Sequence, residues 1–87
     1  MRQPPEFFGE EDLDLVYIAK KLDEALAVEK LFDDAELDYL VEPDKYKGGV
    51  IFASERIGAF FYVAPVKGAS AREVLANAGY RHQKIGE

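Results

Sequence analysis

The stretch that most constrains the fold is the uncharged run Gly58–Val63, which is mostly aromatic or β-branched. This composition is typical of a strand that is buried on both faces. A second apolar run, Val50–Ala53, precedes it, and Ser54, Glu55 and Arg56 form the polar break between the two. We therefore predict a β-hairpin whose second strand lies near the middle of a sheet.

Three periodic segments precede this hairpin. Apolar residues alternate over 13–19, which predicts a strand, and recur at three- and four-residue spacing over 22–35, which predicts a helix. A second alternating segment, 37–42, predicts another strand that Pro43 ends. Strand, helix and strand with short connections predict a parallel βαβ unit. Residues 44–49 are then expected to form a loop.

A second helix is expected near the end of the chain. Ser70 and Glu73 have the spacing of a capping box, in which each side chain bonds a free backbone N–H. The helix would run over 71–78 and stop at Gly79. Whether residues 80–85 add a short edge strand is left open.

These elements predict an α+β fold with the ferredoxin-like order β-α-β-β-β-α, in which two helices cover one face of a mainly antiparallel sheet. A chain of 87 residues is long enough for one modest core. We expect residues 1–12 to be a flexible tail and residues 13–87 to be the single domain. Phe7 and Phe8 are the two residues of the tail that would dock on that domain.

Charge and composition narrow the function. The net charge of −6 argues against nucleic acid as a partner, because its phosphates require clustered Lys and Arg. Acidic side chains dominate residues 1–44 and basic ones residues 45–87, as either a solvated face or a dipolar surface that orients a partner. The absence of cysteine, of a long apolar run and of a signal-peptide core predicts a cytoplasmic protein that is not membrane-bound.

The residues also resemble a known family. Tyr17-Ile18-Ala19, the segment Leu37–Glu42 and the closing strand Phe60–Pro65 are similar to parts of small bacterial signal-transducing ferredoxin-like domains of unknown function. The resemblance covers about residues 14–78. It implies a role in binding a small ligand or a partner, and no catalysis.

No catalytic or metal-binding pattern stands out. His82 is the single histidine and has cationic neighbours, which disfavours a metal. The serines lie outside any nucleophile elbow. The acidic residues Asp33, Asp34, Glu36 and Asp38 lack the spacing and the glycine of a calcium loop. We therefore predict no catalytic residues, no metal and no cofactor, and a regulatory or protein-interaction module that is not an enzyme.

Aromatic residues suggest where a partner would bind. If Tyr62 and Phe60 share the face of Tyr17 and Tyr39, the helix-free side of the sheet carries an aromatic patch, and exposed apolar patches mark interfaces. The predicted partner-binding residues are Leu15, Tyr17, Tyr39 and Tyr62. The equally weighted alternative is that these rings point under the helices.

A second function class is a sensor of a small anionic metabolite. Its site would be the predicted loop Tyr46–Gly49 with nearby cations. The candidate ligand-binding residues are Lys45, Tyr46, Lys47, Gly48, Gly49 and Arg56. The plainer interpretation is a hairpin connection, because no helix follows the two glycines as in a phosphate loop.

We also predict a homodimer. A small domain has a thin core, and two aromatic sheet faces can pack on one another with twofold symmetry. The competing possibility is that residues 1–12 fold back and cover that face within one chain.

Overall fold

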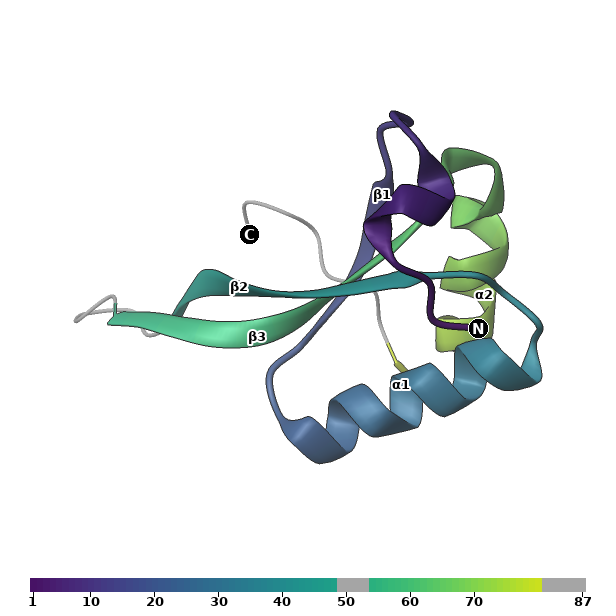
Figure 1. Cartoon of the computed structure of the whole chain (residues 1–87). Helices are drawn as coiled ribbons and strands as arrows, with labels where there is room; N and C mark the ends of the chain where they lie inside the picture. Colours follow the sequence, from purple (N-terminus) through teal and green to yellow (C-terminus); the bar gives the residue numbers. More distant parts are fainter. Residues whose placement is uncertain (49–53, 81–87) are drawn as a thin grey trace.

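A computed structural model describes residues 1–48 and 54–80 of the chain. Two helices and a three-stranded antiparallel sheet make it an α+β protein (Figure 1). The strands are β1 (Asp14–Ala19), β2 (Leu40–Gly48) and β3 (Ser54–Val63), and the α-helices are α1 (Leu22–Asp34) and α2 (Gly68–Asn77). Short 3-10 helices form at Pro5–Phe8 and Pro65–Lys67.

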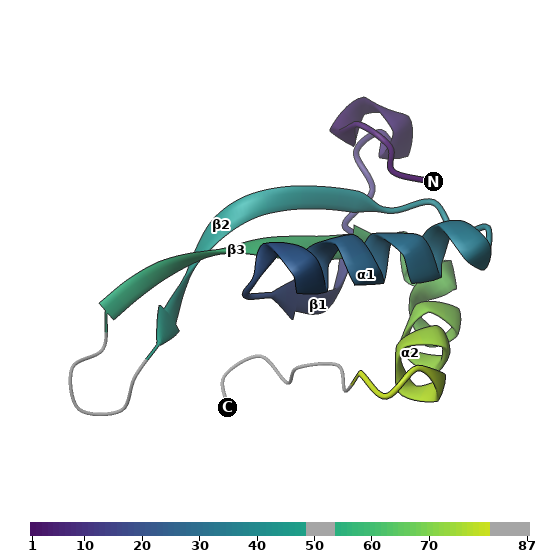
Figure 2. The same ribbon diagram turned by 90° about the horizontal axis from the view of Figure 1, so that it is seen from below.

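The central strand is β3, as the apolar run at its end predicts. The strand order is β1-β3-β2, and β3 pairs antiparallel with both neighbours. β1 and β2 therefore run in the same direction but do not touch, because β3 lies between them. Both helices pack on one face of the sheet, where Val28 of α1 and Leu75 of α2 share a single core with Phe61 of β3 (Figure 2).

The predicted β-α-β-β-β-α order is wrong for the described residues, which form three strands. Residues 44–48, expected as a loop, continue β2, and residues 54–56, expected as a break, begin β3. Pro43 does not end β2, because β2 is an edge strand and its outer edge needs no N–H donor. The strand predicted at 50–53 and the possible strand at 80–85, Tyr80 apart, lie outside the described residues.

A β-bulge in β1 changes which side chains face the helices. Leu15 lies opposite Tyr62, but Tyr17 lies opposite Phe61, so Val16 is an extra residue in β1. Val16 and Tyr17 are both buried in the core beneath the helices. Strict alternation through β1 therefore fails after Leu15.

The core is built around three rings from three different segments. Phe32 of α1 lies 5.4 Å from Tyr39 and 6.0 Å from Phe61, measured between ring centroids, and Tyr39 lies 5.9 Å from Phe61. All three side chains are fully buried. The two pairs made by Phe32 are edge-on, and aromatic pairs of this kind stabilise a core beyond the apolar area they bury.

The helix ends agree only in part with the sequence. Gly79 ends α2 with φ of 89°, as predicted, and Glu36 takes the same left-handed conformation after α1, with φ of 58°. The capping box is wrong, because α2 begins at Gly68 and Ser70 therefore lies inside its first turn. The Asp14 carboxylate lies beside the first turn of α2 and pairs with Arg72 at 3.8 Å, which suits the helix dipole.

The first residues of the chain attach to the start of β2. The Gln3 N–H donates to the Tyr39 carbonyl at 2.8 Å, and the Tyr39 N–H donates to the Met1 carbonyl at 3.2 Å. Phe8 is half-buried, whereas Phe7 is exposed. No helix in the described part of the chain combines the length and the apolar character needed to cross a bilayer.

Gly58 allows a close approach across the face of the sheet away from the helices. A Cβ atom at this position would lie 3.0 Å from the Ala19 carbonyl oxygen, 3.0 Å from the Tyr46 ring and 3.2 Å from the Ile18 side chain. The glycine thus lets the ring of Tyr46 reach across β3 towards β1.

We expect the Gly58→Ala variant to lower the free energy of unfolding by about 1–2 kcal/mol, since overpacking outweighs the reduced entropy of the unfolded chain. Urea denaturation measures this loss. Adding Tyr46→Ala removes one of the close contacts and should lessen the loss. A Gly58→Ala variant as stable as the wild type would contradict this account.

Candidate binding groove

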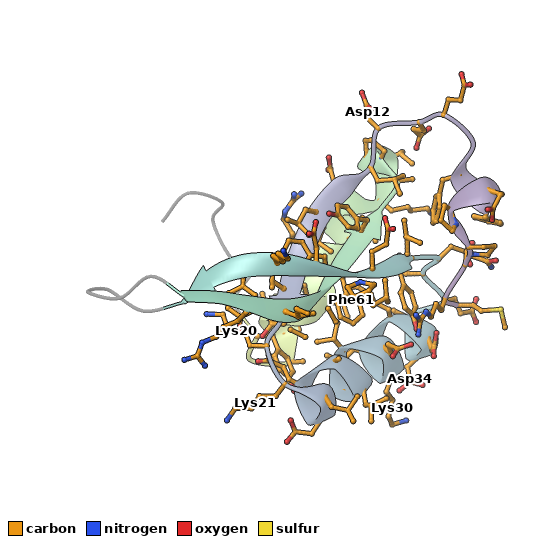
Figure 3. All side chains as sticks on the ribbon, turned by 60° about the vertical axis from the view of Figure 1, so that its left-hand side comes forward. Asp12, Lys20, Lys21, Lys30, Asp34 and Phe61 are labelled. Atoms are coloured by element: carbon orange, nitrogen blue, oxygen red, sulfur yellow. The ribbon has the colours of Figure 1, made fainter. Side chains whose placement is uncertain are left out.

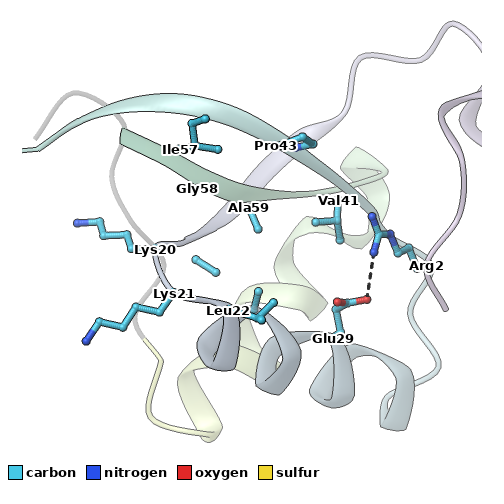
Figure 4. A pocket seen from close by; sticks show the side chains of 12 residues that line it. Arg2, Lys20, Lys21, Leu22, Glu29, Val41, Pro43, Ile57, Gly58 and Ala59 are labelled. Carbon is cyan, nitrogen blue, oxygen red and sulfur yellow. Dashed lines mark ion pairs between the residues drawn. The ribbon is translucent and has the colours of Figure 1, made fainter. Parts of the chain in front are cut away.

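An open cavity of about 390 Å³ separates α1 from the β2–β3 hairpin on the helix side of the sheet (Figure 4). Its lining is mostly apolar, with charged residues at its two ends. The residues that line it are Arg2, Ala19, Lys20, Lys21, Leu22, Ala25, Glu29, Val41, Pro43, Ile57, Gly58 and Ala59. We refer to this cavity as the α1–hairpin groove.

The groove exists because the strands differ in length. β1 has six residues, whereas β2 has nine and β3 has ten. The last pair between β1 and β3 joins Ala19 to Ala59, so the hairpin continues beyond the end of β1. Figures 1 and 2 show this part of the hairpin projecting past the start of α1. Its helix-side face therefore has no helix packed fully against it.

Large apolar side chains flank the α1–hairpin groove and remain exposed. Leu22 of α1 is 76% exposed on one side, and Ile57 of β3 is 70% exposed on the other. Leu26, one turn after Leu22, is 56% exposed. These three are half of the large apolar side chains that are exposed in the part of the chain that the structure describes. Clustered exposed apolar surface of this kind is typical of a binding site.

The two ends of the groove differ in charge. Lys20 and Lys21 stand at one end, whereas Arg2 and Glu29 form an ion pair of 3.8 Å at the other (Figure 4). The Lys20 ammonium lies 5.5 Å from the centroid of the Tyr46 ring, a cation–π arrangement. The end at the start of α1 therefore has the stronger positive charge.

Glu24 fixes the turn that carries these lysines. Its carboxylate accepts a hydrogen bond from the Tyr17 hydroxyl at 2.8 Å and another from the Lys20 N–H at 2.8 Å. Burial, together with the Glu24 carboxylate, raises the pKa of Tyr17 well above its usual value. The bonds connect β1 to the first turn of α1 and so hold the end of the groove in place.

A second, acidic cavity of about 560 Å³ lies at the far end of α1, and its acidic residues are Glu29, Asp33, Glu36 and Asp38. The Tyr39 hydroxyl donates to Asp33 at 3.1 Å, and the Met1 amine lies within 3.6 Å of both Asp33 and Asp38. Within residues 1–48 and 54–80, no three Asp, Glu or His side chains are placed to hold one metal ion.

The predicted partner-binding residues do not form one surface. Tyr17 and Tyr39 are buried in the core beneath the helices, whereas Leu15 and Tyr62 lie on the opposite face. The prediction that they share a face is therefore wrong. The bulge at Val16 separates Leu15 from Tyr17, and the register that sets Leu40 opposite Tyr62 places Tyr39 on the other face from Tyr62. The alternative, that rings point under the helices, is correct for Tyr17 and Tyr39.

The predicted anion-binding loop is also not a loop in the described residues. Lys45, Tyr46, Lys47 and Gly48 belong to β2, and Arg56 lies opposite Tyr46 on β3. Gly49 and His82 lie outside the described residues. Extended strand backbone does not turn successive N–H groups toward one anion, so this segment lacks the geometry of a phosphate loop.

The sequence did contain a weak signal for the α1–hairpin groove. Leu22 and Leu26 fit the apolar pattern of α1 but lie at its margin, beyond the buried residues Ala25, Val28 and Phe32. The sequence alone does not show whether such residues are buried or exposed, because that depends on where the neighbouring strands lie.

Comparisons with protein-family models, with curated proteins and with solved structures find no match to this chain.

Proposed function

We propose that this protein is a small regulatory or protein-interaction module without catalytic chemistry, and that its partner binds in the α1–hairpin groove. The observation that carries this proposal is the exposure of Leu22 and Ile57 on opposite sides of a mostly apolar hollow. Burial of two such side chains contributes about 3–6 kcal/mol to binding before the entropic costs of association.

The exposed apolar side chains around the groove favour a macromolecular partner over a small metabolite. A small molecule inside the hollow would leave the outer surfaces of Leu22, Leu26 and Ile57 in water. An amphipathic helix could cover all three, because its apolar face docks into grooves of this kind. Acidic residues at one end of that helix would lie beside Lys20 and Lys21.

One part of the topology supports a ferredoxin-like classification. β1 and β2 run parallel on either side of β3 and are joined through α1, which is a split β-α-β arrangement. The sequence resemblance to signal-transducing domains of this class points the same way.

A selection of amphipathic peptides from a displayed library tests the binding role. We expect selected peptides to bind the Leu22→Glu variant more than tenfold more weakly, because a buried, unpaired carboxylate costs well over 1.4 kcal/mol. Val66→Glu is the matched control, since Val66 is 83% exposed and does not line the groove. Peptides that bind both variants as tightly as the wild type would overturn the proposal.

A further inference from the structure

We infer that the partner of the α1–hairpin groove is an acidic amphipathic helix. Its apolar face packs between Leu22 and Ile57, and its carboxylates lie at the end that faces Lys20 and Lys21. This inference rests on the proposed binding role of the groove and names the chemistry of the partner.

Three exposed lysines surround the end of the groove at the start of α1. Lys20 and Lys21 belong to the turn before α1 and line the groove. Lys45 is exposed and lies opposite Ile57 in the register of β2 and β3. Because directly paired residues of antiparallel strands point to the same face, Lys45 stands on the groove side of the hairpin. Positive charge therefore reaches this end of the groove from both of its walls.

The acidic side chains nearest to these lysines are engaged in local hydrogen bonds. The Glu24 carboxylate accepts from the Tyr17 hydroxyl and from the Lys20 N–H, and the Asp23 carboxylate accepts from the Glu24 N–H at 2.9 Å. In the described part of the chain, no ion pair joins Lys20 or Lys21 to a carboxylate. Both ammonium groups are therefore available to carboxylates of a partner.

The charge changes sign along α1. Figure 3 shows Lys20 and Lys21 at the start of this helix and Asp34 at its end. At the far end of the groove Glu29 already forms its ion pair with Arg2, and the acidic cavity lies next to it. Carboxylates of a partner at that end would meet like charges. The acidic residues of the partner are therefore expected at the lysine end alone.

The length of the groove sets the length of the helix. Lys21 and Glu29 line its opposite ends and lie about two turns apart, which is about 12 Å along α1. An amphipathic helix of about three turns spans this distance and places apolar residues at i and i+4 over the hollow. The side chains of Ala25 and Ala59 in the lining are small and leave room for those residues.

An anionic membrane is the main rival, since lysines beside exposed apolar residues are also typical of helices on membrane surfaces. The chain has a net charge of −6, so an anionic surface repels it as a whole. A flat bilayer would also touch Leu22 and Ile57 without filling the hollow between them. Charge and shape together therefore favour the helix.

A displayed library of amphipathic helices about three turns long tests the inference on the full chain. The polar positions of the library vary among Glu, Gln and Lys. We expect recovered peptides to carry Glu at one end and to bind about fivefold more tightly than versions with Gln in its place. Added salt should reduce this difference. Peptides that bind equally well with Gln, or that carry Lys at these positions, would overturn the inference.

A charge reversal at Lys21 locates the acidic end of the partner. Lys21→Glu should weaken binding of the recovered peptides about fivefold, and peptides with Lys in place of Glu should bind this variant better than the wild type. Lys67→Glu is the matched control, because Lys67 is also exposed, precedes α2 as Lys21 precedes α1, and does not line the groove. Equal affinities of the two variants for the recovered peptides would overturn the inference.

Two other occupants would also overturn it, and each has its own measurement. Phosphatidylserine vesicles that bind the wild type but not Leu22→Glu would identify a membrane as the occupant. A wild type with twice the 9.8 kDa mass of one chain in light scattering, and a Leu22→Glu variant with the mass of one, would identify a second copy.

The inference and the proposed function fail in different ways. Recovered peptides that depend on Leu22, but neither on Lys21 nor on their own Glu residues, would overturn the acidic partner and leave the binding role of the groove intact. A library that yields no Leu22-dependent peptide would overturn both.

Discussion

The Phe61→Ala variant should be less stable than the wild type by about 3–5 kcal/mol. Phe61 lies on the central strand, is completely buried, and contacts both Phe32 and Tyr39 through its ring. Its loss would leave a cavity in contact with α1 and the start of β2. A domain of this length has a total stability of roughly 4–13 kcal/mol, so the variant should be partly unfolded at 37 °C.

Urea denaturation followed by circular dichroism measures this loss. Phe7→Ala is the matched control, because it removes the same side chain from a position that is 53% exposed. Its ring lies against that of Phe8, and Phe7 does not belong to the core cluster. We expect its free energy of unfolding to fall by less than about 1 kcal/mol. Equal losses in the two variants would show that Phe61 is not central to the core.

The second large effect is a steep loss of stability above about pH 10. Burial raises the pKa of Tyr17 and of Tyr39, and the carboxylates to which their hydroxyls donate raise it further. Both tyrosines therefore keep their protons in the folded chain at pH values where the unfolded chain has lost them. Stability is fully present below the unfolded pKa of about 10 and falls as pH rises towards the folded pKa.

Each tyrosine lowers the free energy of unfolding by up to about 1.4 kcal/mol per pH unit in that range. Urea denaturation at about pH 9, 10 and 11 measures how steeply the free energy of unfolding falls with pH. The matched comparison is the double variant Tyr17→Phe and Tyr39→Phe, in which the titrating hydroxyls are absent. We expect its stability to fall less steeply with pH, whereas identical slopes would mean that other groups govern alkaline unfolding. Burial also raises the pKa of Tyr62, so some slope should remain.

Much of the fold could be predicted from local patterns. The helix period over 22–35 places Val28 and Phe32 inward, and the structure confirms both the helix, over Leu22–Asp34, and their burial. The apolar run that ends at Val63 is the central strand, because its neighbours on both sides supply hydrogen bonds. In both segments the spacing of the apolar residues in the sequence agrees with the burial of those residues in the fold.

The errors come from features that a local pattern does not encode. One inserted residue, Val16, reverses the faces of every residue before it in β1 and so divides the predicted partner site. Pro43 is tolerated because β2 lies at the edge of the sheet, a fact about strand order. The α1–hairpin groove depends on the difference in length between β1 and the hairpin, which appears only once the register is known.

The two strands that pair with β3 differ in their distance from it along the chain. β2 is joined to β3 by residues 49–53, whereas β1 pairs with β3 only after α1 and β2 have intervened. Hairpins form within microseconds, and contacts between distant segments form more slowly because a longer loop must close. Ala19 at the end of β1 also lines the α1–hairpin groove, so we expect the groove to be complete only when β1 has paired with β3. A partner in the groove therefore binds the native state alone, and the folded population rises with the concentration of that partner.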